Sequence, residues 1–296
     1  MAGNAIVSKI LLPVEFSERC LGAVRYAEAL ACRFHAGIVV LHAVPAPYAV
    51  YGGAGEISAY YNINEVLAER MASSQAQLDR LVAGMPSDLP IRTELREGDP
   101  ARVIVEYAHA EKFDLIVMPT HGYGPFRRFL IGSVTAKVLH DVDVPVWTGP
   151  HLEKAPEWKS VGWSRIACAI DLGPHSAAVL RWGAAMAQAC GAKLTIVHAI
   201  AAAAEGAGGM SFDPDWGADI AHDARKRITE LQNELGIAAE IHIEPGEPAA
   251  AVTRAGRCVE ADMMVIGRSV SGGVLGRLRA NAYAIIRESP CPVVSV

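Results

Sequence analysis

The sequence predicts an α/β protein made of two similar domains, each with a parallel sheet covered by helices on both faces. Short apolar runs alternate with stretches of helical periodicity along its 296 residues. Most of these runs are nearly continuously apolar, as in strands that are buried on both sides. Right-handed crossovers between such strands give a doubly wound sheet. The same order of motifs also occurs twice, which predicts two copies of one domain.

The repeat shows as pairs of segments at a nearly constant offset. Ser8–Glu15 corresponds to Ser164–Asp171 at an offset of 156 residues, and Asp114–Met118 corresponds to Asp262–Ile266 at 148. A constant register interrupted by one net deletion of eight residues indicates a tandem duplication. We therefore expect a first domain over residues 1–150, a linker over residues 151–163 and a second domain over residues 164–296.

Each copy is expected to begin and end with a strand and to alternate strands with helices. In the first copy, the strands are expected at Lys9–Val14, Ile38–Val44, Ile91–Arg96, Asp114–Met118 and Pro145–Thr148. The helices are expected at Arg19–Phe34, from about Asn64 to Ala83, from Gly98-Asp99-Pro100 through His109, and over Thr135–His140. Ser17 is a plausible N-cap for the first helix.

Composition and charge restrict the class of protein. Hydrophobic residues make up 51% of the chain and charged residues 20%, which is typical of a soluble globular protein. The net charge of −5 argues against binding to nucleic acid, which requires a basic surface. Apolar runs are too short to span a membrane, and the N-terminus lacks a charged segment before an apolar one. We therefore expect a cytoplasmic protein that binds neither membrane nor nucleic acid.

The cysteines and histidines do not indicate metal or redox chemistry. The six cysteines form no CxxC pair, and the ten histidines form no HExxH pattern. Most cysteines stand among apolar residues, so we interpret them as reduced thiols of the core. His42 and His198 end equivalent strands and are interpreted as core histidines with satisfied hydrogen bonds. Trp158 and Trp163 of the linker are expected to pack between the domains.

The segment Met118–Val134 is the candidate ligand site. It reads as the end of a strand, a glycine-bearing loop and the start of a helix, where parallel α/β sheets bind ligands. Backbone N–H groups and the helix N-terminus favour an anion there, and Ser133 could cap the helix or donate to that anion. His121 and the pair Arg127-Arg128 are either phosphate contacts or solvated residues. Pro119 weakens the prediction because it has no N–H.

The motifs taken together resemble the universal stress protein family in its two-domain form. They are the strand-ending Glu15-Phe-Ser, LHAV and IVHAI, the turns REGDPA and EPGEPA, DLIVMPTHG, and GSVTAKVLHDVDVPV. The resemblance implies a Rossmann-like domain, repeated, with a five-stranded parallel sheet of order 3-2-1-4-5. It also implies dimers or an internal pseudo-dimer, and a role in stress survival that is regulatory more often than catalytic. Nucleotide-binding members carry a G-x2-G-x9-G-[ST] loop and an aspartate at the end of the first strand.

The first domain keeps much of this pattern. Gly122, Gly132 and Ser133 match the last two glycines and the hydroxyl, whereas Pro119 replaces the first glycine and Glu15 replaces the aspartate. The resemblance implies ATP or a related adenine nucleotide, with Mg²⁺ as its companion ion. The residues implied as nucleotide contacts are Pro13, Val14, Glu15, Ala43, Met118, His121, Gly122, Gly132, Ser133 and Val134.

The second domain departs from the pattern in its loop. Asp171 is present, but Val270 replaces a glycine and Arg279-Ala280-Asn281 stands where Gly-Ser is expected. A β-branched valine does not readily adopt positive φ. Nucleotide binding by this half is therefore not expected, and Asp171, Ala199 and Gly267 are weaker candidates.

The sequence thus favours a regulatory tandem stress protein with a nucleotide in its first domain and an unidentified protein partner. One alternative is a nucleotide-free interaction module. Another is a slow ATPase, with at most weak hydrolysis, because no Walker-type lysine or positioned base is visible. The loops Tyr48–Tyr61 and Ala201–Trp216 are either lids over the sheet edge or ordinary connections.

Overall fold

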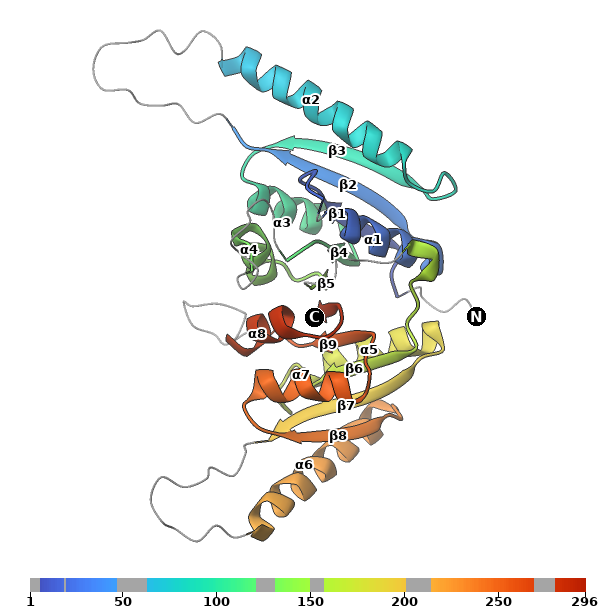
Figure 1. Cartoon of the computed structure of the whole chain (residues 1–296), viewed down its shortest axis with the longest axis vertical. Coiled ribbons are helices and arrows are strands. Elements are labelled where there is room, and N and C mark those ends of the chain that lie inside the picture. Colours follow the sequence, from blue (N-terminus) through green and yellow to red (C-terminus); the bar gives the residue numbers. More distant parts are fainter. Residues whose placement is uncertain are drawn as a thin grey trace, which may run out of the picture.

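The two halves of the chain share one ten-stranded sheet. The computed structural model describes residues 6–18, 20–46, 63–120, 131–149, 157–200, 214–268 and 280–296. In this part of the chain the strand order is β3-β2-β1-β4-β5-β10-β9-β6-β7-β8 (Figure 1). Each half therefore has the order 3-2-1-4-5 that the resemblance implied.

The elements follow the expected alternation in both halves. The strands are β1 Lys9–Pro13, β2 Gly37–Val44, β3 Ile91–Glu97, β4 Leu115–Val117, β5 Val146–Thr148, β6 Arg165–Ala169, β7 Lys193–Ile200, β8 Glu240–Pro245, β9 Met263–Ile266 and β10 Val293–Ser295. The helices are α1 Cys20–Phe34, α2 Ile63–Ala83, α3 Pro100–Glu111, α4 Ser133–Asp141, α5 Ser176–Cys190, α6 Pro214–Leu235, α7 Pro248–Cys258 and α8 Ala280–Glu288. A short 3₁₀ helix, η3, spans Trp158–Ser160.

The halves join where β5 pairs with β10. This pairing is antiparallel, with Trp147 opposite Val294, whereas the other strand pairs within each half are parallel. Equivalent strands of the two copies therefore meet across an approximate twofold axis. The chain forms an internal pair of domains, one of the arrangements expected from the resemblance.

Alternating side chains of the strands fill two cores. Ile10 and Leu12 point to one face of the sheet and Leu11 to the other, and all three are fully buried. Helices α1, α2, α5 and α6 cover the first face, and α3, α4, α7 and α8 cover the second (Figure 1). Burial on both faces explains why the central strands, such as Leu115–Val117 and Met263–Ile266, are apolar at every position.

Two duplicated polar contacts hold the ends of the elements in both halves. Asp114 accepts hydrogen bonds from the N–H groups of Ser8 and Lys9, both at 2.9 Å, and Asp262 accepts equivalent bonds at the start of β6. Asp99 caps α3 through the N–H of Arg102, and the equivalent glutamate caps α7. Each helix begins with proline at its first position, which suits the missing N–H.

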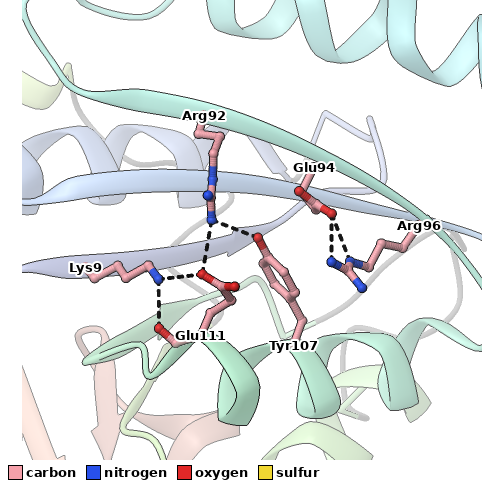
Figure 2. Close-up of polar contacts among 6 residues, drawn as sticks. All are labelled: Lys9, Arg92, Glu94, Arg96, Tyr107 and Glu111. Atoms are coloured by element: carbon pink, nitrogen blue, oxygen red, sulfur yellow. Dashed lines mark hydrogen bonds and ion pairs between the residues drawn. The ribbon is translucent and has the colours of Figure 1, made fainter.

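The outer strand β3 is tied to α3 by a polar cluster (Figure 2). Arg92 donates to the hydroxyl of Tyr107 at 2.9 Å, and Arg96 lies over the Tyr107 ring at 4.5 Å. Lys9 reaches the same helix through Glu111, with Nζ 2.9 Å from the carboxylate. These charges pair with one another on an exposed surface, so we interpret the cluster as local stabilisation of the edge strand.

The linker packs against the centre of the molecule. Trp163 is 7% exposed and meets Trp147 edge-on, with ring centroids 5.6 Å apart. Trp158 also packs against the first core. Both tryptophans therefore contribute to packing at the junction of the halves, as expected.

Some expected boundaries and contacts differ. The hydroxyl of Ser17 donates to Glu15 at 2.8 Å, where the sequence suggested a cap on the first helix. Helix α6 already begins at Pro214, within the segment expected to be a loop. Cys258 is exposed, unlike the buried Cys20, Cys168 and Cys291. The other expected loop, Tyr48–Tyr61, lies outside the described residues.

Candidate functional site

A cavity of about 280 Å³ opens at the carboxyl ends of the first-domain strands. It lies between the ends of β1, β2 and β4 and the first turns of α3 and α4. The described residues that line it are Pro13, Val14, Glu15, Cys20, Leu41, His42, Ala43, Pro100, Ile104, Met118, Pro119, Gly132, Ser133, Val134 and Thr135. This is the edge of a parallel α/β sheet where ligands bind.

Eight of the ten residues implied as nucleotide contacts lie around this cavity. They are Pro13, Val14, Glu15, Ala43, Met118, Gly132, Ser133 and Val134. His121 and Gly122, like the pair Arg127-Arg128, lie outside the described residues. Segments far apart in the sequence thus meet at one place, because the carboxyl ends of parallel strands share one edge of the sheet.

The first turn of α4 presents backbone donors to the cavity. Gly132 is the N-cap of α4, so the expectation that Ser133 caps the helix was wrong. Glycine has no side chain with which to cap, and the first helical N–H groups lack acceptors within the helix. The hydroxyl of Thr135 is already used, since it donates to the carbonyl of Pro119 at 2.9 Å. The amides of this first turn and the helix dipole make this end of the cavity suitable for an anion.

Glu15 lines the same cavity from the end of β1, beside a strained turn. The next residue, Phe16, has a φ of 61°, which non-glycine residues rarely adopt. The Glu15 carboxylate accepts from Ser17, and its backbone N–H donates to the sulfur of Cys20 at 3.3 Å. Burial raises the pKa of the Cys20 thiol, so Cys20 is a neutral acceptor in the wall of the cavity. The carboxylate of Glu15 is therefore fixed next to the β1 end.

His42 is a lining residue that the sequence interpretation placed only in the core. Its Nδ1 lies 2.7 Å from the carbonyl oxygen of Val14, and its ring packs on Phe16 with centroids 4.4 Å apart. Because a carbonyl only accepts, Nδ1 carries the hydrogen, and Nε2 of the neutral ring is an acceptor. Burial lowers the pKa of His42, which favours this neutral form. Its position at the end of LHAV was the signal for a site residue.

The second domain contains an equivalent cavity of about 230 Å³. Asp171, Ala199 and Gly267, the weaker candidates from the sequence, all line it. The sequence reasoning judged this half by its loop and gave no reason to expect that the strand ends would enclose a comparable space. Val270 and the loop glycines Gly272, Gly273 and Gly276 lie outside the described residues.

The described part of the chain contains neither a candidate metal site nor a candidate membrane-spanning helix. No group of three or more His, Cys, Asp and Glu side chains there is arranged to hold a metal ion. None of the described helices combines the length and the apolar character needed to cross a bilayer.

Both halves of the chain are similar in sequence to known proteins. The sequence model of the universal stress protein family matches residues 7–148 and again residues 162–296. A universal stress protein of Methanocaldococcus jannaschii is 31% identical over 144 residues, which are 49% of this chain and 82% of that protein.

Two solved structures are similar over nearly the whole chain. A universal stress protein from Archaeoglobus fulgidus has a TM-score of 0.69 at 23% identity, covering 97% of each chain. A functionally unknown protein from Pseudomonas aeruginosa has a TM-score of 0.65 at 18% identity, covering 99% of this chain and 94% of its own. At these identities the structures support the fold, while the sequence match supports the family. The chain belongs to the universal stress protein family and carries two copies of its domain.

Proposed function

We propose that the first domain binds ATP or a related adenine nucleotide as a regulatory ligand. The observation that supports this most strongly is the cavity at the ends of β1, β2 and β4, which brings Glu15 and Ala43 together with the first turn of α4. An apolar floor of strand-end residues suits a base, and the uncapped amides of α4 suit a phosphate. The two ends of a nucleotide would therefore meet matching surfaces.

The phosphates would lie at the start of α4. Gly132 leaves this start without a capping side chain, and Ser133 brings a hydroxyl to the first turn. Mg²⁺ would come with the nucleotide, because it is commonly held by phosphates and water with few protein ligands. The described residues include no group arranged to hold a metal ion by themselves, which is consistent with that mode.

The residues that line the first-domain cavity favour a regulatory role over a catalytic one. Glu15 is engaged by Ser17 and stands on the nucleoside side, and the described lining contains no lysine. Slow hydrolysis of the bound nucleotide is the catalytic alternative, and phosphate release above the buffer rate would support it.

A nucleotide-free interaction module remains a distinct second function. Pro119 favours it, because a proline at this position of the cavity offers no N–H to a phosphate. The internal pair of domains would then act as a docking body for the unidentified protein partner.

Gly132 offers a substitution that separates these functions. An aspartate at an N-cap stabilises a helix, but here its charge would lie where we place the phosphates. We expect Gly132→Asp to weaken ATP binding at least about tenfold, because like charges repel strongly at such distances. Gly132→Asn is the matched control, since it caps equally well without a charge.

Isothermal titration calorimetry with ATP and Mg²⁺ measures the affinity of both variants. Urea unfolding checks that both variants remain as stable as the unmodified chain. If the unmodified chain shows no heat and no displacement of a fluorescent ATP analogue at millimolar nucleotide, the interaction module is the better function. Equal affinity of the aspartate and asparagine variants would show that the phosphates do not lie at α4.

A further inference from the structure

Helix α4 lies between the first-domain cavity and the second domain. Ser133 and Val134 of its first turn line the cavity, and its C-cap, Val142, accepts a hydrogen bond from Arg268 of the second domain. A helix of nine residues is only about 14 Å long, so a tilt at one end displaces the other end. The second domain therefore contacts the same short helix at which we place the phosphates of a nucleotide.

Arg268 reaches the end of α4 from a fixed position. It follows shortly after β9, and its backbone N–H donates to the carbonyl of Val296 at 2.7 Å, which ties its main chain to the last residue of the sheet. Its guanidinium donates to the carbonyls of Val142 and Val144 at 2.7 and 2.8 Å. A planar guanidinium that makes two such bonds restrains both the distance and the direction of its partner. Arg268 is therefore suited to set the orientation of α4.

A second contact reaches α4 nearer its start. The hydroxyl of Tyr283 on α8 donates to the carbonyl of Ala136 at 3.2 Å. Each of the two is the fourth residue of its helix, so they stand at equivalent positions across the approximate twofold axis. The methyl side chain of Ala136 cannot return this bond, and Thr120, the counterpart of Arg268, has no guanidinium. Both contacts therefore run from the second domain to α4.

The first domain itself restrains α4 through residues of its first two turns. The hydroxyl of Thr135 donates to the carbonyl of Pro119 at 2.9 Å, and Lys137 lies 3.3 Å from the carboxylate of Asp99. The second of these is an exposed ion pair, which contributes little to holding a helix in place. Arg268 adds two directed hydrogen bonds at the opposite end of the helix.

We propose that the second domain positions the phosphate end of the first-domain site, with Arg268 as the main positioning residue and Tyr283 as a lesser one. Together they hold α4 so that the amides of its first turn face the cavity. Groups that bind a ligand must be held within about 0.5 Å of the productive geometry by the residues around them. The affinity of the first domain for a nucleotide therefore depends on the second domain. This rests on the proposed function, because it takes ATP as the ligand.

Calorimetric titration of the full chain with ATP and Mg²⁺ tests this dependence. Arg268→Met should raise the Kd for ATP about tenfold, a typical size for coupling between two sites. Arg268→Lys keeps the charge without the planar fork, so its Kd should lie between those of the unmodified chain and Arg268→Met. Tyr283→Phe removes one neutral hydrogen bond and should raise the Kd about two- to threefold. The two milder variants decide the matter if Arg268→Met does not fold.

Gly183→Ala is the matched control for lost stability. A Cβ on Gly183 would meet the sulfur of Cys168, on the face of the sheet opposite to α4. This variant should change the Kd for ATP by less than about twofold, because the two sites are distant from each other. Circular dichroism checks that every variant is folded at the temperature of the titration. If Gly183→Ala weakens ATP binding as much as Arg268→Met does, the effect is a general loss of stability and the inference is overturned.

Adenosine separates the positioning of the phosphates from support of the whole cavity. It carries the nucleoside part alone, and the methyl NMR signal of Ile104 reports its binding in the first cavity. Arg268→Met should leave the Kd for adenosine unchanged while it weakens the binding of ATP. An equal loss for both ligands would contradict the inference, because Arg268 would then support the cavity as a whole.

Amide NMR of the ligand-free chain makes the test independent of the proposed function. The N–H signals of Ser133 and Val134 should shift in Arg268→Met and stay in place in Gly183→Ala. Unchanged signals in Arg268→Met would overturn the inference even if ATP binds. If the unmodified chain binds no ATP, the proposed function fails, and these shifts alone decide whether the second domain positions α4.

Discussion

Arg268 of the second domain caps a helix of the first through Val142. Its Nη1 lies 2.7 Å from the carbonyl oxygen of Val142, the C-cap of α4, and its Nη2 lies 2.8 Å from that of Val144. The guanidinium thus meets carbonyl groups that have no partner within the helix, at the negative end of the helix dipole. Arg268 is 6% exposed, and the equivalent residue in the first domain is Thr120. The first half therefore has no arginine at this position with which to return the contact.

Replacing Arg268 should weaken the junction between the domains. We expect Arg268→Met to lower the free energy of unfolding by about 2–3 kcal/mol, because it removes two charge-assisted hydrogen bonds and leaves buried carbonyls without partners. Arg268→Lys should recover only part of this, since an ammonium group lacks the planar fork that reaches both carbonyls. Urea unfolding followed by tryptophan fluorescence measures the change.

The exposed Arg257 on α7 provides the control for lost charge. Arg257→Met should change the stability by less than about 0.5 kcal/mol. A similar small effect for Arg268→Met would mean that the contact across the domains contributes little to folding.

A second prediction concerns the packing of α5 on β6. A Cβ atom placed on Gly183 would lie 2.0 Å from the sulfur of Cys168, which is fully buried. Gly183→Ala should therefore destabilise the chain by about 1–3 kcal/mol, although alanine is the better helix former. Cys168→Ala in the same chain removes the sulfur and should restore most of the loss.

Gly217 on α6 supplies the matched control, because a Cβ there has no neighbour within 4 Å. Gly217→Ala should stabilise by up to about 1 kcal/mol. Thermal unfolding of Gly183→Ala, Cys168→Ala and the variant that carries both gives the coupling energy between positions 183 and 168. A coupling near zero would contradict the close approach of α5 and β6.

Much of the fold could be predicted because the sequence contains the same pattern of strands, helices and turns twice. Apolar strands such as Leu115–Val117 and turns such as Gly98-Asp99-Pro100 recur at fixed offsets, which gives the elements and their order. Gly98 has a φ of 139°, a conformation that favours glycine at this turn. The antiparallel pairing of β5 with β10 was less accessible, because backbone pairing between distant strands leaves little trace in side-chain patterns.

The candidate site could be predicted where strands end and less well elsewhere. The resemblance implied Glu15 and Ala43 as contacts, and the structure brings both to the cavity because the carboxyl ends of parallel strands converge. The cap at Ser133 was wrong, because glycine is also a common N-cap and one residue of register cannot be read from spacing. The second cavity was undervalued because the second domain was judged by its loop, where Val270 replaces a glycine, whereas the cavity is lined by strand ends and first helical turns.

The third prediction follows from Glu28, a buried carboxyl group on α1. Glu28 is 5% exposed, and burial raises the pKa of its carboxyl group to about 7. The positive charge of Arg25 opposes this rise, and the negative charge of Glu157 adds to it. The unfolded chain titrates this group near 4.5. Between these values the unfolded state has lost the proton while the folded state keeps it. Stability should therefore fall as the pH rises from about 4.5 to about 7, by an amount on the order of 3 kcal/mol from this group.

Glu28→Gln tests this sign directly. Glutamine resembles the protonated carboxyl group and does not titrate, so the variant should be more stable than the unmodified chain at pH 8 and similar to it near pH 4.5. Urea unfolding at both pH values gives the difference. Glu106→Gln, on the exposed face of α3, is the control for the substitution itself and should change the stability by less than about 0.5 kcal/mol. If Glu28→Gln destabilises at pH 8, the folded chain must hold Glu28 as an ion with a favourable partner, and the burial of its carboxyl group would not oppose ionisation.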